Sequence, residues 1–249
     1  MGGQPQYYFV SLSVPAHTPR NFITELYRGM HFQAKRFQVM LLGGDTVASN
    51  HGMSVNVTLI GTAKKKNIVY RHGAKKGDLI YVSGSPGDSA LGLRMIEKGQ
   101  NGPSGNPLIR KHLDPEPRID AGKAIAWSQT ATSMIDISDG LVADLKHLLT
   151  SSHVGAEIYL PMLPLSAKYK KQCLDFFNEF YHPALCGGED YELLFTVNPG
   201  NITHVKKIAK QTKTSLTCIG KITGRESRLL ILDKNGKEVD VQENGYTHF

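Results

Sequence analysis

The sequence predicts a two-domain α/β protein, and three observations lead to that fold class. A chain of 249 residues with 40% hydrophobic and 20% charged content can bury a core in one large or two small domains. Segments with the apolar spacing of strands alternate with segments that have the spacing of helices. A stretch with two lysine runs ends at Gly77 and has the composition of a connection. We therefore expect domains over residues 1–62 and 78–249, with a linker over 63–77.

The first domain is predicted to contain three strands and one helix. Residues 7–14 are rich in aromatic and β-branched side chains and precede a proline, as a strand does. Residues 19–37 begin with a proline and carry apolar side chains at near-helical spacing. A buried strand at 39–42 is expected to run into a turn at Gly43-Gly44. A strand with two distinct faces is expected over 53–59, where apolar and polar residues alternate.

The second domain is predicted to alternate strands and helices in the same way. Its expected strands lie at residues 79–82, 134–137, 157–160, 191–195, 216–222 and 229–232. Its expected helices lie at residues 90–99, 108–113, 119–129, 141–149, 166–180 and 202–211.

The net charge of +7 and the pI near 9.2 are compatible with an anionic ligand, nucleic acid or solubility alone. The basic runs at Lys64–Lys66 and Lys75-Lys76 lack interleaved aromatic residues, so we expect no nucleic-acid partner. No stretch has the apolar length of a membrane span, and the first residues lack the pattern of a signal peptide. Three widely spaced cysteines form no metal or redox pair. We expect a cytoplasmic protein without membrane contact.

The segment SMIDISDGLVADL, residues 133–145, places acids where a strand gives way to a helix. One interpretation is that Ser138 caps the helix and Asp139 complements its dipole, which would contribute ~1 kcal/mol. Asp136 needs another explanation, because it ends an apolar strand where no cap is required. Gly140 costs ~1 kcal/mol relative to alanine inside a helix, which suggests that something approaches the backbone closely. Carboxylates repel phosphate unless a divalent cation lies between them, and hard oxygen ligands of this kind favour Mg²⁺.

Two further segments combine glycines with acids beside a buried strand: Gly43-Gly44-Asp45-Thr46 and Gly187-Gly188-Glu189-Asp190. Structural explanations remain open for both. The first could be an ordinary two-glycine turn, and the second a tight loop whose acids protect a strand edge from aggregation. The chain contains none of the G-x-x-x-x-G-K-[ST], G-x-G-x-x-G, H-E-x-x-H and G-x-S-x-G motifs. A nucleotide site would therefore have to be built from acids and magnesium.

The sequence resembles bacterial thiamine-monophosphate kinase over nearly its whole length. The segments that carry this resemblance are GGDT (43–46), YRHGAKKGDLIYVSGSPGDSALGL (70–93), IDISDGLVADL (135–145), GGEDYELLF (187–195) and GYTHF (245–249). The family belongs to the ATP-binding superfamily of aminoimidazole ribonucleotide synthetase and selenophosphate synthetase. The resemblance implies a PurM-like architecture, with a dimerising N-terminal α/β domain and a C-terminal α/β domain. It also implies Mg²⁺-dependent transfer of the γ-phosphoryl group of ATP to thiamine monophosphate, in a homodimer.

The resemblance also implies roles for individual residues. Asp45, Asp136 and Asp139 would be the magnesium ligands. Gly44, Arg71 and Ser138 would contact ATP, with Arg71 on its phosphates. Glu189 and Tyr246 would hold the thiamine substrate, by charge or hydrogen bond and by stacking respectively. No covalent enzyme intermediate is expected, because phosphoryl transfer depends on positioning and charge neutralisation.

The chain departs from the family pattern at its start. Family members begin with two acidic strands that supply further magnesium ligands, whereas Glu25 is the only acid here before Asp45. We therefore expect weak or no turnover by the isolated chain, unless an upstream piece is supplied in trans or the start codon is misassigned. Three alternatives remain: another member of the superfamily with a different acceptor, a non-catalytic nucleotide-binding or dimerising remnant, and a basic α/β protein whose glycine-acid turns are structural.

Overall fold

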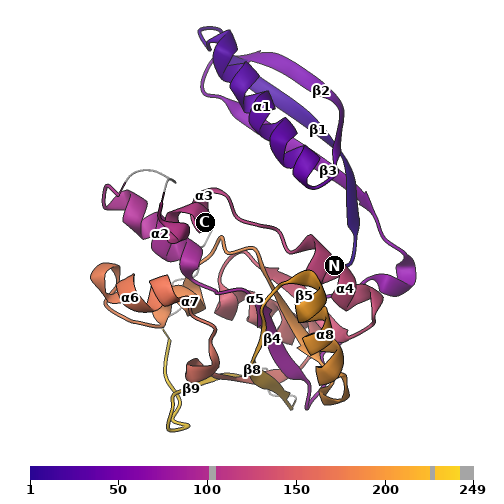
Figure 1. The fold of residues 1–249 in the computed structure, drawn as a ribbon, viewed down its shortest axis with the longest axis vertical. Coiled ribbons are helices and arrows are strands. Elements are labelled where there is room, and N and C mark those ends of the chain that lie inside the picture. The colour runs from indigo at the N-terminus through magenta and orange to yellow at the C-terminus, as the bar shows by residue number, and fades with distance from the viewer. Residues whose placement is uncertain (101–104, 225–227, 242–249) are drawn as a thin grey trace. The chain divides into compact units, whose positions relative to one another are not determined.

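The computed structural model describes residues 1–100, 105–224 and 228–241, and the chain divides into two compact units (Figure 1). The small unit comprises Gly3–Lys66, and the large unit comprises Met1–Gly2 with the chain from Asn67 onward. Each unit has its own sheet. None of the helices in the described residues combines the length and the hydrophobicity that crossing a lipid bilayer requires.

The small unit is a three-stranded sheet with one long helix. β1 (Gln4–Pro15) lies in the middle, parallel to β2 (Met40–Ser49) and antiparallel to β3 (Ser54–Thr62). α1 (Arg20–Arg36) connects the two parallel strands, close to the helix that the sequence predicts. Its apolar side chains cover alternate buried residues of β1: Tyr8, Val10 and Leu12.

β2 continues through Gly43 and Gly44, so the turn predicted after residue 42 is wrong. The register between β1 and β2 shifts at this point, because Tyr8 pairs with Leu41 whereas Phe9 pairs with Gly43. A Cβ atom at Gly44 would lie 1.8 Å from the carbonyl oxygen of Val10. The neighbouring strand therefore accounts for the glycine at position 44.

The large unit is built around a six-stranded sheet in the order β5-β7-β4-β8-β6-β9. Neighbouring strands are antiparallel except β6 and β9, which are parallel. The strands are β4 (Leu79–Ser83), β5 (Ala131–Ile137), β6 (Gly155–Tyr159), β7 (Glu192–Val197), β8 (Leu216–Thr223) and β9 (Leu229–Leu232).

Helices cover both faces of this sheet, because side chains alternate along each strand. On β4, Ile80 and Val82 join one core, whereas Tyr81 joins the other. α4 and α8 pack on the side of Tyr81, and α2, α3, α5, α6 and α7 contribute to the opposite core. The helices are α2 (Asp88–Glu97), α3 (Pro107–Leu113), α4 (Ile119–Trp127), α5 (Leu141–Ser152), α6 (Ala167–Phe176), α7 (His182–Cys186) and α8 (Ile202–Thr212). Short 3₁₀ turns lie at Lys65–Asn67, Leu160–Met162 and Pro199–Asn201.

Two details of the large unit differ from the sequence prediction. The helix expected to reach residue 180 ends at Phe176, and a separate short helix, α7, follows it. Apolar spacing alone could not separate the two, because side chains on both sides of the break belong to one core or pack against it, including Phe176, Phe180 and Leu185.

Candidate functional site

The predicted junction between strand and helix at Ser138-Asp139-Gly140 is confirmed. β5 ends at Ile137 and α5 begins at Leu141, so these three residues form the whole connection. Asp136 is partly exposed near the end of β5, whereas the strand residues on either side of it are buried. We call residues 136–140 the acid loop.

A buried carboxylate that the sequence did not single out supports the acid loop. Asp144 lies in the first turn of α5 and is 2% exposed. Its Oδ2 accepts hydrogen bonds from the backbone N–H groups of Ser138 at 2.9 Å and Asp139 at 3.1 Å. Burial raises the pKa of Asp144, these two hydrogen bonds oppose the rise, and the charges of Asp139 and Asp136 add to it. Two carboxylates thus lie in the loop, and a third, Asp144 on α5, holds the loop backbone.

The structure corrects one interpretation of this loop and confirms another. Ser138 is not the helix cap, because the N-cap position is Gly140 and no side chain caps it there. The close approach to the backbone inferred at Gly140 is confirmed. Gly140 has a φ of 122°, and a Cβ atom at this position would lie 2.9 Å from the carbonyl oxygen of Cys186. The chain's own backbone therefore accounts for the glycine.

The Gly187–Asp190 segment lies directly against the acid loop. The backbone N–H of Glu189 donates to the carbonyl of Ser138 at 2.8 Å, and that of Tyr191 donates to Ile137 at 2.8 Å. A Cβ atom on Gly188 would lie 2.5 Å from the Ser138 carbonyl oxygen. Two of the three glycine-acid segments therefore meet. The alternative that these acids protect a strand edge is wrong, because β7 lies between β5 and β4.

Glu189 is exposed and held by a neighbouring side chain. The hydroxyl of Tyr191 donates to its Oε2 at 3.1 Å. The pKa of the Tyr191 phenol is raised, first by burial and then by its hydrogen bond to Glu189, with contributions from the charges of Asp136 and Asp139. Tyr191 therefore connects the exposed Glu189 with the acid loop.

Arg71 and Asp136 line one cavity of about 490 Å³ in the large unit. Tyr70 and His72, on either side of Arg71, stack their rings with centroids 5.0 Å apart. The carbonyl of Arg71 accepts a hydrogen bond from the Ser152 hydroxyl at 3.3 Å, which fixes the backbone while the side chain stays exposed. Two residues of the predicted ATP site therefore border the same cavity.

Asp45 and Gly44 lie in the small unit, on β2. Asp45 is exposed and pairs in register with Ser11 of β1. Its Oδ1 accepts a hydrogen bond from the backbone N–H of Thr46 at 2.8 Å. Tyr246, the remaining predicted substrate residue, lies outside the described residues.

Within the described residues, no group of three or more histidine, cysteine, aspartate or glutamate side chains is arranged to hold a metal ion. The acid loop offers two carboxylates, Asp136 and Asp139, whose partial exposure leaves them accessible. Magnesium is usually bound by one or two carboxylates together with substrate phosphates. The donor set of the loop is therefore of the kind that binds Mg²⁺ bridged to a phosphate chain.

Comparison with known proteins decides the family. Models of "AIR synthase related protein" match residues 1–63 with its N-terminal domain and residues 75–232 with its C-terminal domain. The thiamine-monophosphate kinase of Buchnera aphidicola subsp. Acyrthosiphon pisum (strain APS) is 38% identical over 256 residues, which cover 100% of this chain and 76% of the relative. The chain belongs to the thiamine-monophosphate kinase family.

Solved structures of thiamine-monophosphate kinases have the same fold. The enzyme from Stenotrophomonas maltophilia K279a superposes with a TM-score of 0.83 at 29% identity, covering 96% of this chain and 74% of that one. A structure described as "AaThiL complexed with AMPPCP and TMP" has a TM-score of 0.81 at 34% identity, covering 100% of this chain and 75% of that one. The family and the two-domain PurM-like α/β fold predicted from the sequence are thereby confirmed.

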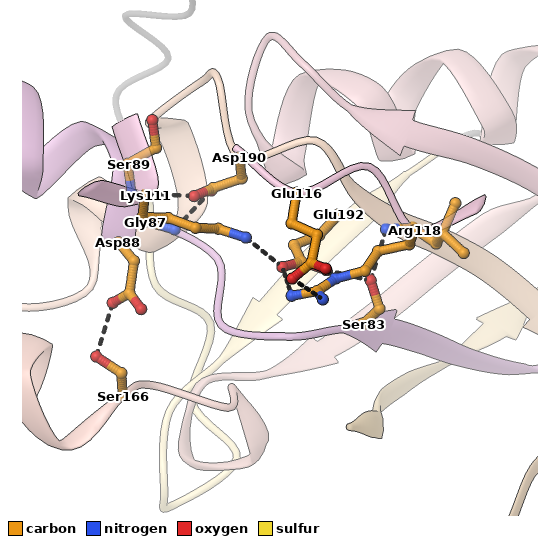
Figure 2. A network of polar contacts seen from close by, with 11 residues as sticks. Ser83, Gly87, Asp88, Ser89, Lys111, Glu116, Arg118, Ser166, Asp190 and Glu192 are labelled. Carbon is orange, nitrogen blue, oxygen red and sulfur yellow. Dashed lines mark hydrogen bonds and ion pairs between the residues drawn. The ribbon is translucent and has the colours of Figure 1, made fainter. Parts of the chain in front are cut away.

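This thiamine-monophosphate kinase family member also contains a buried ionic network that the sequence analysis missed (Figure 2). The side chain of Glu192 is fully buried and accepts hydrogen bonds from Ser83 Oγ at 2.5 Å, Lys111 Nζ at 2.5 Å and Arg118 Nε and Nη2 at 2.8 Å each. Burial by itself raises the pKa of Glu192, but the hydrogen bond from Arg118 and the charge of Lys111 hold it below its ordinary value. The sequence does contain one indication of this network, because Glu192 is a charged residue at the start of the largely apolar strand β7.

Proposed function

We propose that this chain binds Mg·ATP and thiamine monophosphate, and transfers the γ-phosphoryl group of ATP to the phosphate of thiamine monophosphate. The observation that carries the proposal is the 38% identity to a thiamine-monophosphate kinase over the whole chain. Support also comes from the contact between the acid loop and Glu189, which gives nucleotide and substrate residues a common place in the large unit.

In this proposal the nucleotide site combines carboxylates with a cation and backbone groups. Asp136 and Asp139 would hold Mg²⁺, whose charge would neutralise the phosphate chain, and Asp45 on β2 is assigned as a magnesium ligand in the small unit. Arg71 donates to ATP phosphates, since a guanidinium matches phosphate oxygens with two parallel hydrogen bonds. Ser138 and Gly44 contact ATP as well. For Arg71 and Asp136, the support is that both line one cavity of the large unit.

The thiamine site is assigned to Glu189 and Tyr246. Glu189 has the negative charge that complements a thiazolium cation, and the Tyr191 hydroxyl keeps its carboxylate in place. Tyr246 stacks on an aromatic ring of the substrate. During the reaction an oxygen of the thiamine monophosphate phosphate forms a bond to the γ-phosphorus while the bond to the β-γ bridging oxygen breaks. ADP and thiamine diphosphate result, and no group of the protein is phosphorylated.

Two further properties belong to the proposal. We infer a homodimer formed through the small unit, where apolar side chains of β2 and β3 are exposed, including Leu42 (51%), Val57 (53%) and Leu59 (60%). A cytoplasmic location is supported by three free cysteines. Light scattering across a concentration series measures the mass, and a monomer at all concentrations contradicts the dimer.

The test of the function uses the full chain with ATP, Mg²⁺ and thiamine monophosphate. Calorimetry measures binding, and chromatography detects thiamine diphosphate and ADP, with enzyme in excess so that a single slow turnover is seen. We expect both ligands to bind and the two products to form in equal amounts. Asp136→Asn should weaken Mg·ATP binding, whereas Asp120→Asn, a matched change at an exposed acid of α4, should not.

Three results would contradict the proposal in different ways. ATP binding without thiamine monophosphate binding favours a nucleotide-binding protein of another function. Binding of both ligands without products favours a non-catalytic remnant. A rise in melting temperature caused by aminoimidazole precursors, and not by thiamine monophosphate, favours another synthetase of the superfamily.

A further inference from the structure

Asp190 has contacts that neither substrate binding nor metal binding explains. Its side chain is fully buried, next to the exposed Glu189. Its Oδ2 accepts a hydrogen bond from the backbone N–H of Gly87 at 2.6 Å, and its Oδ1 accepts one from Ser89 at 3.2 Å (Figure 2). Gly87 is the N-cap residue of α2 and has no side chain to cap the helix. A carboxylate 103 residues away therefore caps α2.

The residues on either side of Asp190 have a costly backbone conformation. Glu189 has a φ of 65° and Tyr191 a φ of 51°, both in the left-handed region that non-glycine residues rarely adopt. Such conformations persist only where the surroundings over-determine them. Here the N–H groups of Glu189 and Tyr191 are bound to the acid loop at Ser138 and Ile137. The carboxylate between them is bound to α2 on the other side.

We propose that Asp190 is a positioning residue for substrate recognition: it anchors this strained segment to α2 so that Tyr191 holds the Glu189 carboxylate beside the acid loop. The proposal rests on the function proposed above, in which Glu189 binds thiamine monophosphate. It adds a residue that never touches the substrate. A carboxylate suits this task, because both of its oxygens accept and neither donates, so two N–H groups are satisfied together.

An ordinary helix cap would not account for these observations. Serine or asparagine caps a helix without placing a charge in the interior, and burial of a carboxylate is costly. Burial raises the pKa of Asp190 to about 7, against the opposing effect of the two backbone hydrogen bonds. The same carboxylate also belongs to the segment that presents Glu189. Capping from this position links α2 to the Gly187–Asp190 segment, which a local cap at residue 87 would not do.

Asp190→Asn tests the proposal, because the amide keeps the size of the side chain but turns an NH₂ group toward one of the two N–H donors. We expect the Kd for thiamine monophosphate, measured by calorimetry, to rise about tenfold, which corresponds to about 1.4 kcal/mol. The Kd for Mg·ATP should stay within about twofold. Asp78→Asn is the matched control, because Asp78 is also a buried aspartate, 2% exposed. Its Oδ2 accepts hydrogen bonds from the backbone N–H of Lys75 and from the hydroxyl of Thr132, near the start of β5.

A double-variant cycle separates positioning from general destabilisation. If Asp190 acts through Glu189, the chain with both Glu189→Gln and Asp190→Asn should bind thiamine monophosphate as weakly as Glu189→Gln alone. Additive losses in the double variant would overturn the proposal. An unchanged Kd in a folded Asp190→Asn chain would also overturn it, as would an equal loss in the Asp78→Asn control.

A second variant decides the matter if Asp190→Asn does not fold. Tyr191→Phe removes only the hydroxyl that holds Glu189, and we expect a several-fold rise in the Kd for thiamine monophosphate with an unchanged melting temperature. An unchanged Kd would overturn the proposal. Failure of the wild-type chain to bind thiamine monophosphate would instead overturn the proposed function, so the two failures are distinguishable.

Discussion

Replacing Glu192 by glutamine should destabilise the large unit strongly. Glutamine has the same size, but it removes the one carboxylate between Lys111 and Arg118 and adds an NH₂ group among hydrogen-bond donors. The side chain of Glu192 is 0% exposed, and those of Lys111 and Arg118 are 16% and 22% exposed. Breaking a buried ion pair on one side costs about 3–5 kcal/mol, and here Lys111 loses its ion-pair partner while Arg118 keeps only Glu116 at 3.4 Å. For a unit of this size the melting temperature should fall by roughly 6–20 °C.

Thermal unfolding followed by circular dichroism at neutral pH measures this change. Glu157→Gln is the matched control, because Glu157 pairs with Lys221 at 3.1 Å where the two side chains are 23% and 49% exposed. A surface pair of this kind contributes about 0–1 kcal/mol, so its loss should be small. A melting temperature for Glu192→Gln as close to wild type as that of the control would refute the reasoning.

Three further predictions concern the site and its supports. Asp144→Ala should weaken Mg·ATP binding about tenfold in calorimetry, because it removes the one oxygen, Oδ2, that accepts from both loop N–H groups, and an unchanged Kd would show that the loop keeps its conformation without Asp144. Burial raises the pKa of Asp190 from 3.8 to about 7, so this carboxyl stays protonated to a higher pH in the folded state than in the unfolded state. Its contribution to the free energy of unfolding therefore falls as the pH rises from about 4 to about 7. The melting temperature of Asp190→Asn relative to wild type should therefore increase from about pH 4 to pH 7, by an amount that reflects a few kcal/mol, and a constant difference would contradict the burial argument. Gly140→Ala should lower the melting temperature and weaken Mg·ATP binding, because φ is 122° and Cys186 leaves no room for a Cβ, whereas wild-type stability would contradict that geometry.

Local patterns were sufficient to predict most elements of the fold. Apolar spacing placed α1 within one residue of its observed ends, and the change of period after Ile137 located the acid loop. Such signals are local, because a helix or strand buries one face whatever it packs against. The same argument failed at Gly43-Gly44, where two glycines suggested a turn and the structure has a strand. The backbone of Val10 explains the second glycine, and nothing near residue 44 in the sequence reveals it.

Asp144 and Glu192, which support the site and the core beside it, could not be predicted from local patterns either, because their roles depend on contacts with other segments. Asp144 stands on a helix among apolar residues, and only its two N–H partners distinguish it from an ordinary acid of a first turn. Glu192 meets Lys111 and Arg118 across 81 and 74 residues. Contacts at that separation depend on how α3, the start of α4 and β7 are arranged, which local patterns do not determine. The sequence shows a glutamate at the start of an apolar strand, but it does not show that Lys111 and Arg118 pair with it.

The segment Glu189-Asp190-Tyr191-Glu192 shows how one short stretch divides structural from functional acids. Asp190 and Glu192 are two residues apart and both fully buried, whereas Glu189 is exposed. Both buried carboxylates accept hydrogen bonds from neighbouring helices: Asp190 from the N-terminus of α2, and Glu192 from Lys111 of α3. Their partners are backbone N–H groups and cations, which fix the chain. With Asp190 anchored to α2 and the backbone N–H of Glu189 bound to the acid loop, the side chain of Glu189 stays exposed, which is the condition for the substrate role proposed for it.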